Sequence, residues 1–340
     1  MKVKYAFWNN KGGTGKTSLA FQAITRYAEI NPKKKVLVVD FCPQANLSEL
    51  MLGGLHNNGS NVLLEKQGMT PRASIGGYFE RRLISPYSPP TFFARDYIVS
   101  PSVNNEGIPA NIDLICGDPL LEIQANAINT LANQNIPGTN AWLSVIDWMN
   151  DLLSQVKTEY DIAFFDCNPS FSFYTQIALA TTDRIILPVM ADDSSRRAIQ
   201  NAMSLIYGLK LPSDIYKAYM FETKLNDAKR NLPQVHLILK NRITQYMGKA
   251  SAYAAVLSSI DEDIIKLLKS HPRIFTFQKA NDGFVDIRDF QTTGVVAFAK
   301  GLPFSKVQAK KQNVVKRRVQ VKQDYLDNCR KAIEALVKKL

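Results

Sequence analysis

A glycine-rich segment near the amino terminus carries two lysines and a threonine at fixed spacing. Residues 9–18 read NNKGGTGKTS, directly after the apolar run Val3–Trp8 and directly before a run of helical character. Glycines let the backbone curl so that successive N–H groups point at phosphate oxygens, and a helix amino terminus adds partial positive charge. In such a loop Lys16 would reach the β- and γ-phosphates, and the Thr17 hydroxyl would ligate Mg²⁺. The predicted nucleotide-binding residues of the loop are Lys11, Gly12, Gly13, Thr14, Gly15, Lys16, Thr17 and Ser18.

Elements of an α/β fold must position this loop. Short runs rich in Val, Ile, Leu and Phe alternate with longer segments of helical period, which predicts a mostly parallel, twisted sheet with helices on both faces. The predicted strands are Val3–Trp8, Lys35–Asp40, Ile112–Ile115, Asp161–Asp166, Arg184–Val189 and Val235–Leu239. The predicted helices lie near Ser18–Glu29, Ala141–Val156, Phe171–Thr181 and Ser194–Leu209.

The simplest domain assignment is one domain over residues 1–340, with two irregular segments. Residues 52–111 contain many Gly, Pro and Asn residues and few periodic apolar positions, so we interpret this segment as an insertion. The polar stretch Lys210–Pro233 is either an excursion at the edge of the same domain or a short helix with loops.

The position of the first lysine in the loop departs from the general P-loop pattern. Lys11 precedes the glycines, where that pattern leaves the residue free. The loop resembles that of the deviant Walker A ATPases of the ParA/MinD group, a branch of the P-loop NTPases whose loop reads K-G-G-x-G-K-T/S. This resemblance implies an ATPase in which Lys11 crosses a dimer interface and touches the phosphates bound by the partner subunit. Lys11 and Lys16 are then catalytic residues.

Later segments match the same family in order. Val36–Asn46 resembles the second motif, Tyr160–Ser170 resembles the Walker B strand, and Asp183–Val189 resembles a later strand. The resemblance implies that Asp166 holds Mg²⁺ through water, together with Thr17. It also places Asn241, at the end of another strand, where adenine is recognised. The matched ranges are about 1–50, 110–210 and 234–340.

One position departs from the family pattern. Where the family has the aspartate thought to position the attacking water, this chain has Cys42. Asp40 lies two residues earlier, on the same face if the strand continues, and could serve Mg²⁺, the loop, or the water if the backbone shifts. A thiol with a pKa of ~8.5 is a poor substitute for a carboxylate. We therefore predict ATP binding with slow hydrolysis and assign Asp40 as a catalytic residue, although another residue could supply the water contact.

The composition describes a globular chain with an excess of positive charge. It is 46% hydrophobic and 21% charged, and Lys plus Arg number 42 against 30 Asp plus Glu, a net charge of +12. This balance favours a polyanionic partner, either nucleic acid or an anionic membrane face. The apolar stretch Tyr5–Trp8 is too short for a signal-peptide core, and no run approaches the ~18 residues of a membrane span, so we expect a cytoplasmic protein.

The four cysteines do not form a metal-binding pattern. Cys42, Cys116, Cys167 and Cys329 lie far apart, and the chain has three His in all. This spacing argues against zinc. An iron–sulfur cluster at Cys42 or Cys167 is an alternative, but no second cysteine follows the Walker B strand, so small buried thiols are the favoured interpretation.

Most of the excess charge lies in the last 40 residues. Residues 301–340 contain eleven Lys or Arg against three Asp or Glu, a net charge of +8. The final ~18 residues have helical period and should pack on the sheet, because their apolar face lacks the Trp or Phe of a membrane-binding helix. The basic residues upstream suit backbone phosphates, although a solvated face that binds nothing is the alternative. The predicted DNA-binding residues are Lys310, Lys311, Lys316, Arg317, Arg318 and Lys322.

The resemblance implies a positioning switch. ATP would close a homodimer, the dimer would bind nonspecific DNA on the nucleoid, and an adaptor or cargo protein would stimulate its release. The cofactors are ATP and Mg²⁺, and the cargo would be a plasmid, a chromosome or another large body. The alternatives are a MinD-like membrane-associated regulator and an ATP-locked scaffold with vestigial hydrolysis.

Overall fold

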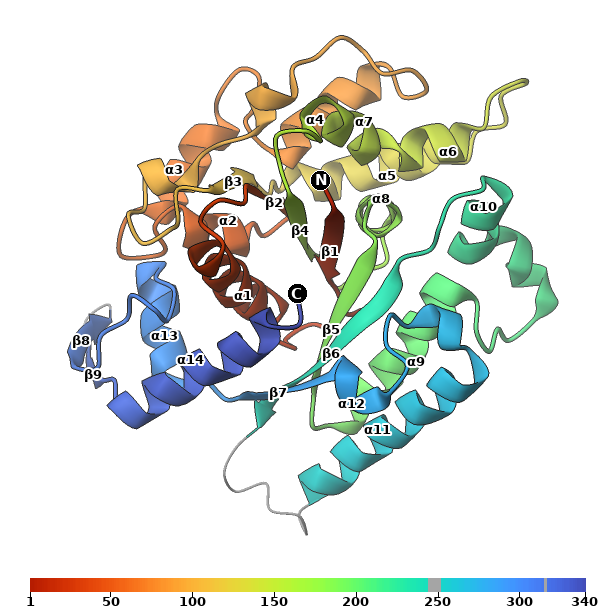
Figure 1. The fold of residues 1–340 in the computed structure, drawn as a ribbon. Coiled ribbons are helices and arrows are strands. Elements are labelled where there is room, and N and C mark those ends of the chain that lie inside the picture. Colours follow the sequence, from red (N-terminus) through yellow and green to blue (C-terminus); the bar gives the residue numbers. More distant parts are fainter. Residues whose placement is uncertain (244–251, 315–316) are drawn as a thin grey trace.

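Seven parallel strands form the central sheet of the computed structural model, which describes residues 1–243, 252–314 and 317–340 (Figure 1). The strand order is β3-β2-β4-β1-β5-β6-β7, and every neighbouring pair is parallel. The strands are β1 Val3–Phe7, β2 Val36–Phe41, β3 Ile112–Ile115, β4 Ile162–Cys167, β5 Arg184–Met190, β6 Gln234–Ile243 and β7 Phe284–Arg288. The predicted fold class is confirmed, and β7 is an additional edge strand.

Helices cover both faces of this sheet (Figure 1). The α-helices are α1 Lys16–Ile30, α2 Asn46–Met51, α3 Gly59–Gln67, α4 Ile75–Ile84, α5 Leu120–Ala132, α6 Ala141–Ile146, α7 Trp148–Val156, α8 Phe173–Thr181, α9 Asp193–Tyr207, α10 Phe221–Asp227, α11 Ala252–Ser270, α12 Ala280–Gly283, α13 Gln291–Lys300 and α14 Gln323–Val337. The 3₁₀ helices are η1 Ala94–Tyr97, η2 Pro101–Val103, η3 Asp214–Tyr219 and η4 Pro272–Ile274.

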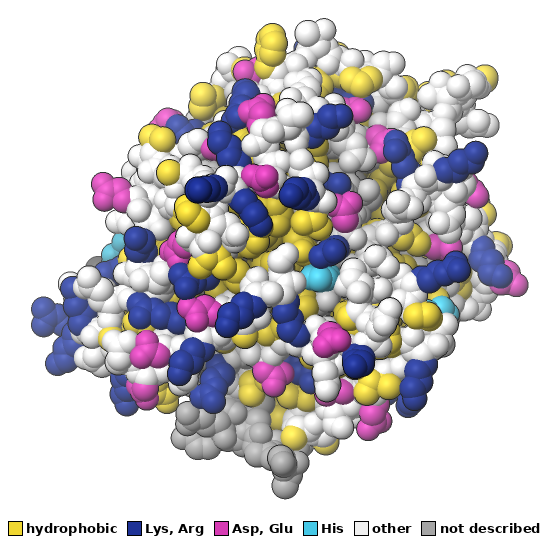
Figure 2. All heavy atoms as spheres, in the orientation of Figure 1, with side chains coloured by type: hydrophobic (Ala, Val, Ile, Leu, Met, Phe, Trp, Pro, Cys, Tyr) yellow, Lys and Arg dark blue, Asp and Glu magenta, His cyan; other side chains and the backbone are white. Residues whose placement is uncertain are grey.

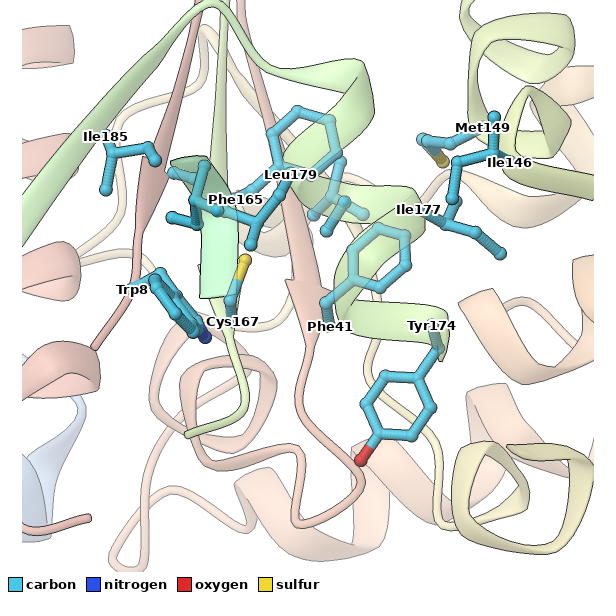
Figure 3. Packing of buried hydrophobic residues seen from close by; sticks show 14 of the residues in the cluster. Trp8, Phe41, Ile146, Met149, Phe165, Cys167, Tyr174, Ile177, Leu179 and Ile185 are labelled. Atoms are coloured by element: carbon cyan, nitrogen blue, oxygen red, sulfur yellow. The ribbon is translucent and has the colours of Figure 1, made fainter. Parts of the chain in front are cut away.

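The side chains of each strand lie alternately in two hydrophobic layers, because successive residues of a strand point to opposite faces of the sheet. Tyr5 and Phe7 of β1 pack with α1 and α14, whereas Trp8 packs on the opposite face with α7 and α8. Cys167, at the end of β4, lies with Trp8 and Phe165 inside this second layer (Figure 3). Its sulfur therefore points into packed hydrocarbon, which supports the buried-thiol interpretation.

The irregular segments contain more regular structure than the sequence indicated. Residues 52–111 include α3, α4 and two 3₁₀ helices, and residues 210–233 fold as η3 and α10 with connecting loops. The predicted helix Ala141–Val156 is wrong as one element: Asp147 separates α6 from α7. Short helices cannot be recognised from the spacing of apolar residues, because one or two turns do not establish a 3.6-residue repeat.

The carboxy-terminal residues form a helix, a hairpin and a second helix. After α13, the antiparallel strands β8 Lys311–Val314 and β9 Arg317–Gln320 pair with each other and pack on α13. In α14 the apolar residues Leu326, Ile333 and Leu336 are buried against α1 and β7, which confirms the predicted packing. The apolar face of α14 is thus already covered by protein. Within the described ranges, no helix has the length and apolar character needed to cross a bilayer.

Candidate nucleotide-binding site

The phosphate loop connects β1 to α1 at the centre of the sheet. Helix α1 begins at Lys16, so the amides of Lys16, Thr17 and Ser18 belong to its first turn and have no partner within the helix. Gly13 and Gly15 have φ values of 74° and 86°, which favour glycine. A Cβ on Gly15 would also lie 2.3 Å from Asn241 Nδ2, so close approach excludes a side chain there. The loop has the backbone form that phosphate binding requires.

The two lysines of the loop point to different groups. Lys16 is buried, and its Nζ donates to the Lys11 carbonyl at 3.1 Å. Burial lowers the pKa of Lys16, and the nearby Asp166 opposes this shift. The Nζ of Lys11 instead donates to both carboxylate oxygens of Asp192 at 2.7 Å and to Ser195 Oγ at 3.2 Å. Both partners of the Lys11 ammonium therefore belong to the same chain.

Asp192 combines this ion pair with a helix cap. It is the N-cap of α9, where its Oδ1 accepts a hydrogen bond from the Ser195 amide. Burial alone would raise the pKa of Asp192, but hydrogen bonds from Lys11, Ser194 and Ser195 lower it to about 2. Asp192 is therefore ionised, and its stabilising pair with Lys11 fully formed, above the ordinary carboxyl pKa of ~3.9. This stabilisation is lost only as the pH falls toward the lower pKa of Asp192 in the folded protein.

Two buried carboxylates lie side by side beyond the loop. Asp40 of β2 and Asp166 of β4 are register partners, and both are almost completely buried. Asp40 accepts hydrogen bonds from the Cys42 amide at 3.1 Å, from the Ser48 amide at 2.9 Å and from Ser48 Oγ at 2.7 Å. These contacts anchor the β2–α2 turn. The catalytic role of Asp40 stays a prediction.

Asp166 has the features of a cation ligand. Among the described residues, neither of its carboxylate oxygens has a well-formed hydrogen bond, although both are buried. Burial and the neighbouring Asp40 raise the pKa of Asp166 to about 7, while the Thr17 hydroxyl and Lys16 act to lower it. Oxygen ligands in this arrangement suit Mg²⁺. The residues present therefore fit the predicted ion, and the assignment of Thr17 and Asp166 to Mg²⁺ stays a prediction.

Cys42 lies next to this pair but cannot replace a carboxylate. Burial, Asp40 and Asp166 raise the pKa of the Cys42 thiol to about 12. The thiol is therefore neutral at pH 7 and can neither accept a proton readily nor orient water as an anion does.

A cavity of about 810 Å³ extends from the phosphate loop to the carboxy-terminal elements. Asn241 lines this cavity, and its Nδ2 donates to the Thr14 carbonyl at 2.9 Å, which joins β6 to the loop. Its lining residues include Gly15, Thr17, Ser18, Asn46, Asn241, Arg242, Asp289, Phe290, Gln291, Gly294, Phe298 and Val314. The loop residues and Asn241, which the sequence predicts to bind nucleotide, line this cavity, whereas no local motif marks the wall from Asp289 to Phe298.

The predicted DNA-binding residues gather on the β8–β9 hairpin and its flanks. Lys310, Lys311, Arg317, Arg318 and Lys322 are all exposed, and among the described residues none pairs with a carboxylate. Figure 2 shows Lys and Arg side chains crowded at the edge of the molecule where β8 and β9 lie. Lys316 lies outside the described residues.

Comparisons with known proteins agree with this geometry. A family model described as an AAA domain matches residues 2–214. Curated relatives include the cell division protein PomZ of Myxococcus xanthus, 24% identical over 60% of this chain and 51% of its own. The chromosome-partitioning ATPase Soj of Treponema pallidum is 25% identical over 55% of this chain and 56% of its own. The chain spans about half the length of the curated relatives it matches.

Solved structures share the fold over nearly the whole chain. The ATP complex of a McdA variant from Cyanothece has a TM-score of 0.59 at 14% identity, covering 98% of this chain and 96% of that one. A plasmid partition protein from Borrelia burgdorferi has a TM-score of 0.52 at 16% identity, and all of both chains is covered. Because the family model matches residues 2–214, more than half of the chain, the chain belongs to the AAA domain family, and the relatives to which it is similar include a chromosome-partitioning ATPase.

Proposed function

We propose that this chain is an ATP-dependent dimer that binds nonspecific DNA and, with an adaptor protein, partitions or positions a plasmid, a chromosome or another large cargo. The observation that carries the proposal is the different placement of the two loop lysines. Lys16 is buried inside the loop, whereas Lys11 pairs with Asp192 outside it. Lys11 is therefore available to reach phosphates bound by a second copy once this ion pair opens.

Each residue of the site would contribute to phosphoryl transfer by position and charge. The loop amides and Lys16 would cradle the β- and γ-phosphates, and Thr17 with Asp166 would hold Mg²⁺. When bound, Mg²⁺ neutralises negative charge on the phosphate oxygens. Lys11 of a second copy would add one more positive charge. Electrostatic stabilisation of this kind remains intact when the water-orienting carboxylate is missing, so we expect binding to be retained and hydrolysis to be slow.

Sizing the protein by light scattering tests the dimer directly. A dimer should form with ATP or a non-hydrolysable analogue, and a monomer should persist with ADP or without nucleotide. A Lys11→Ala variant should bind ATP but remain monomeric. An oligomeric state that is the same in every nucleotide condition would contradict the proposal.

Breaking the Lys11–Asp192 pair should favour the dimer. Asp192→Asn removes the negative charge while keeping a good N-cap for α9. Because partly exposed ion pairs contribute at most about 1 kcal/mol, we expect the concentration of protein needed for ATP-dependent dimerisation to fall about two- to fivefold. Light scattering across a dilution series measures this shift.

Asp193→Asn is the matched control, because Asp193 is the next residue and pairs with Arg197 on the same helix. It should leave dimerisation unchanged. If both variants behave alike, the Lys11–Asp192 pair does not limit dimer formation.

The cavity connects the predicted nucleotide site with the elements that support the basic hairpin. Helix α13 contributes Gln291, Gly294 and Phe298 to the wall of the cavity, and the β8–β9 hairpin packs on the same helix. The hairpin residue Val314 lines the cavity as well. A nucleotide that fills this space would therefore contact helix α13, on which the basic hairpin packs. We expect this contact to make DNA binding depend on which nucleotide is bound.

Removing positive charge from the hairpin region should weaken DNA binding and reduce its salt dependence. We expect the triple variant Lys310→Ala, Lys311→Ala, Lys322→Ala to lower the slope of log affinity against log salt by about 0.9 for each phosphate that the protein no longer neutralises. The control removes three exposed lysines elsewhere, Lys2, Lys33 and Lys35. Fluorescence anisotropy with a mixed-sequence duplex at several salt concentrations measures both slopes. Equal slopes for the two triple variants would exclude the hairpin region as the DNA-binding surface.

The neutral thiol at Cys42 favours a second candidate, a scaffold that remains locked with ATP. A single-turnover experiment with radiolabelled ATP separates the two functions. A switch releases phosphate at a rate that DNA or an adaptor can increase, whereas a locked scaffold retains intact ATP for as long as the protein stays folded.

A further inference from the structure

We propose that Asn168 orients the water that attacks ATP, in place of the carboxylate that Cys42 does not supply. Asn168 follows strand β4, two residues after Asp166, and its side chain is held by Tyr174 and Glu122. This inference rests on the proposed ATPase function and deepens it, because it names a residue that touches a reactant where the neutral thiol cannot act.

The topology of the sheet places Asn168 beside Cys42. Strands β2 and β4 are neighbours, and their register pairs Phe41 with Cys167 as the last residues of the two strands. Neighbouring strands of a sheet lie about 4.8 Å apart. Cys42 and Asn168, the next residues of the two chains, therefore leave the sheet side by side. Asn168 is partly exposed, so water can reach it.

A chain of hydrogen bonds holds the Asn168 side chain. Its Nδ2 donates to the Tyr174 hydroxyl oxygen at 2.5 Å, and that hydroxyl donates to Glu122 Oε1 at 3.2 Å. Glu122 lies in the first turn of α5, which follows β3, whereas Asn168 follows β4. Because β2 lies between β3 and β4, this chain spans the end of the strand that leads to Cys42.

Tyr174 is a rigid support for this chain of hydrogen bonds. Its side chain is 1% exposed and belongs to the same hydrophobic layer as Trp8 and Phe41. In Figure 3 the Tyr174 hydroxyl points away from the labelled hydrophobic side chains. Packing of the ring therefore fixes the position of the hydroxyl to which the Asn168 amide is bonded.

The chemistry of the three groups determines which end of the Asn168 amide is free. A carboxylate only accepts hydrogen bonds, so the single proton of the Tyr174 hydroxyl goes to Glu122. The hydroxyl oxygen then accepts from the amide nitrogen, which turns Oδ1 of Asn168 the other way. Among the residues that the structure describes, Oδ1 has no hydrogen-bond partner. The network therefore presents one oriented acceptor beside Cys42.

In the proposed step, Oδ1 of Asn168 accepts a hydrogen bond from the attacking water. The water oxygen forms a bond to the γ-phosphorus while the bond between this phosphorus and the bridging oxygen of ADP breaks. A proton of the water passes to a phosphate oxygen, because a neutral amide accepts a hydrogen bond without taking the proton. Amide side chains orient water in GTPases as well. Orientation without proton transfer agrees with the slow hydrolysis that the neutral Cys42 predicts.

Two fluoride complexes of ADP test this assignment without relying on turnover. ADP with beryllium fluoride imitates bound ATP, whereas ADP with aluminium fluoride imitates the transition state and holds a water in the attacking position. Both complexes carry the same charge, so the ratio of their dissociation constants reports contacts to the water. Displacement of a fluorescent ADP from the full chain with Mg²⁺ measures both constants. We expect the wild type to bind the aluminium fluoride complex about tenfold more tightly, or more.

Variants of the network should change this ratio in a defined order. Asn168→Ala removes the acceptor and should abolish the preference while keeping the affinity for the beryllium fluoride complex. Asn168→Asp keeps an oxygen at the same position and should retain the preference. Tyr174→Phe leaves the amide without its anchor and should reduce the preference about fivefold, the effect of one hydrogen bond. Single-turnover hydrolysis should be slowest in Asn168→Ala.

Tyr87→Phe is the matched control for the tyrosine variant. The Tyr87 hydroxyl donates to the Leu131 carbonyl at 3.0 Å, outside the site, so its removal also costs one hydrogen bond. This variant should change neither the ratio nor the rate of hydrolysis.

The outcomes separate this inference from the function on which it rests. If Asn168→Ala keeps the wild-type ratio, or if Asn168→Ala and Asn168→Asp lose affinity for both complexes alike, Asn168 has no contact with the water and the inference is overturned. If the wild type shows no preference between the complexes, the inference is overturned as well, whereas ATP-dependent dimerisation stands. If the wild type binds neither complex nor ATP, the proposed function also fails.

Discussion

Replacing Lys16 with alanine should abolish nucleotide binding and every property that depends on it. Lys16 is the buried ammonium of the phosphate loop, and it lies near Asp166. Without this positive charge, a bound triphosphate would be repelled by the two buried carboxylates of the site. Removing one preorganised charge of this kind costs about 100-fold or more in rate, so we expect a loss of at least 100-fold in ATP affinity or turnover.

Calorimetric titration with ATP and Mg²⁺ measures this loss, and circular dichroism shows whether the variant is folded. Lys11→Ala is the matched control within the same loop. It should keep the ATP affinity of the monomer and lose only the dimer, because its ammonium points away from the loop in the monomer. A Lys16→Ala protein that binds ATP like the wild type would contradict the assignment of the loop.

Restoring a carboxylate at position 42 should accelerate hydrolysis. Cys42 is neutral at pH 7, because burial, Asp40 and Asp166 raise its pKa to about 12. In Cys42→Asp, an acceptor would stand where the family positions the attacking water. Positioned general bases contribute about 100- to 10,000-fold, and an imperfect fit beside two existing carboxylates reduces this gain, so we expect an increase of about tenfold or more.

Single-turnover phosphate release at saturating ATP and Mg²⁺ gives the comparison. Cys42→Ala should hydrolyse ATP at the wild-type rate, since the thiol contributes no charge. If Cys42→Asp is no faster than Cys42→Ala while both bind ATP, another residue already orients the water. Asp40→Ala then identifies or excludes the nearest candidate.

Local features of the site could be predicted from the sequence. The loop of residues 9–18 depends on glycines and on a strand–turn–helix order that are contiguous in the chain, and the buried strands carry apolar runs bounded by Asp40 and Asp166. Such patterns reflect backbone geometry and burial, which neighbouring residues determine.

Contacts between distant segments could not be predicted. Asp192 pairs with Lys11 across 181 positions, and nothing in its neighbourhood distinguishes it from the acidic caps of other helices. The wall of the cavity beyond Asn241 comes from α13. In the sequence these residues have only the pattern of a packed helix, and the fold alone brings them close to the loop. In the sequence the hairpin is visible only as a cluster of charge, because four-residue strands are too short to show alternation reliably.

If nucleotide controls DNA binding, retention of the protein on immobilised nonspecific DNA should depend on the nucleotide present. The wild type and Lys16→Ala are compared with ATP, with ADP and without nucleotide, at low and at high salt. We expect retention of the wild type with ATP alone, a steep loss as salt rises, and no retention of Lys16→Ala in any condition. Equal retention with ATP, with ADP and without nucleotide would contradict it.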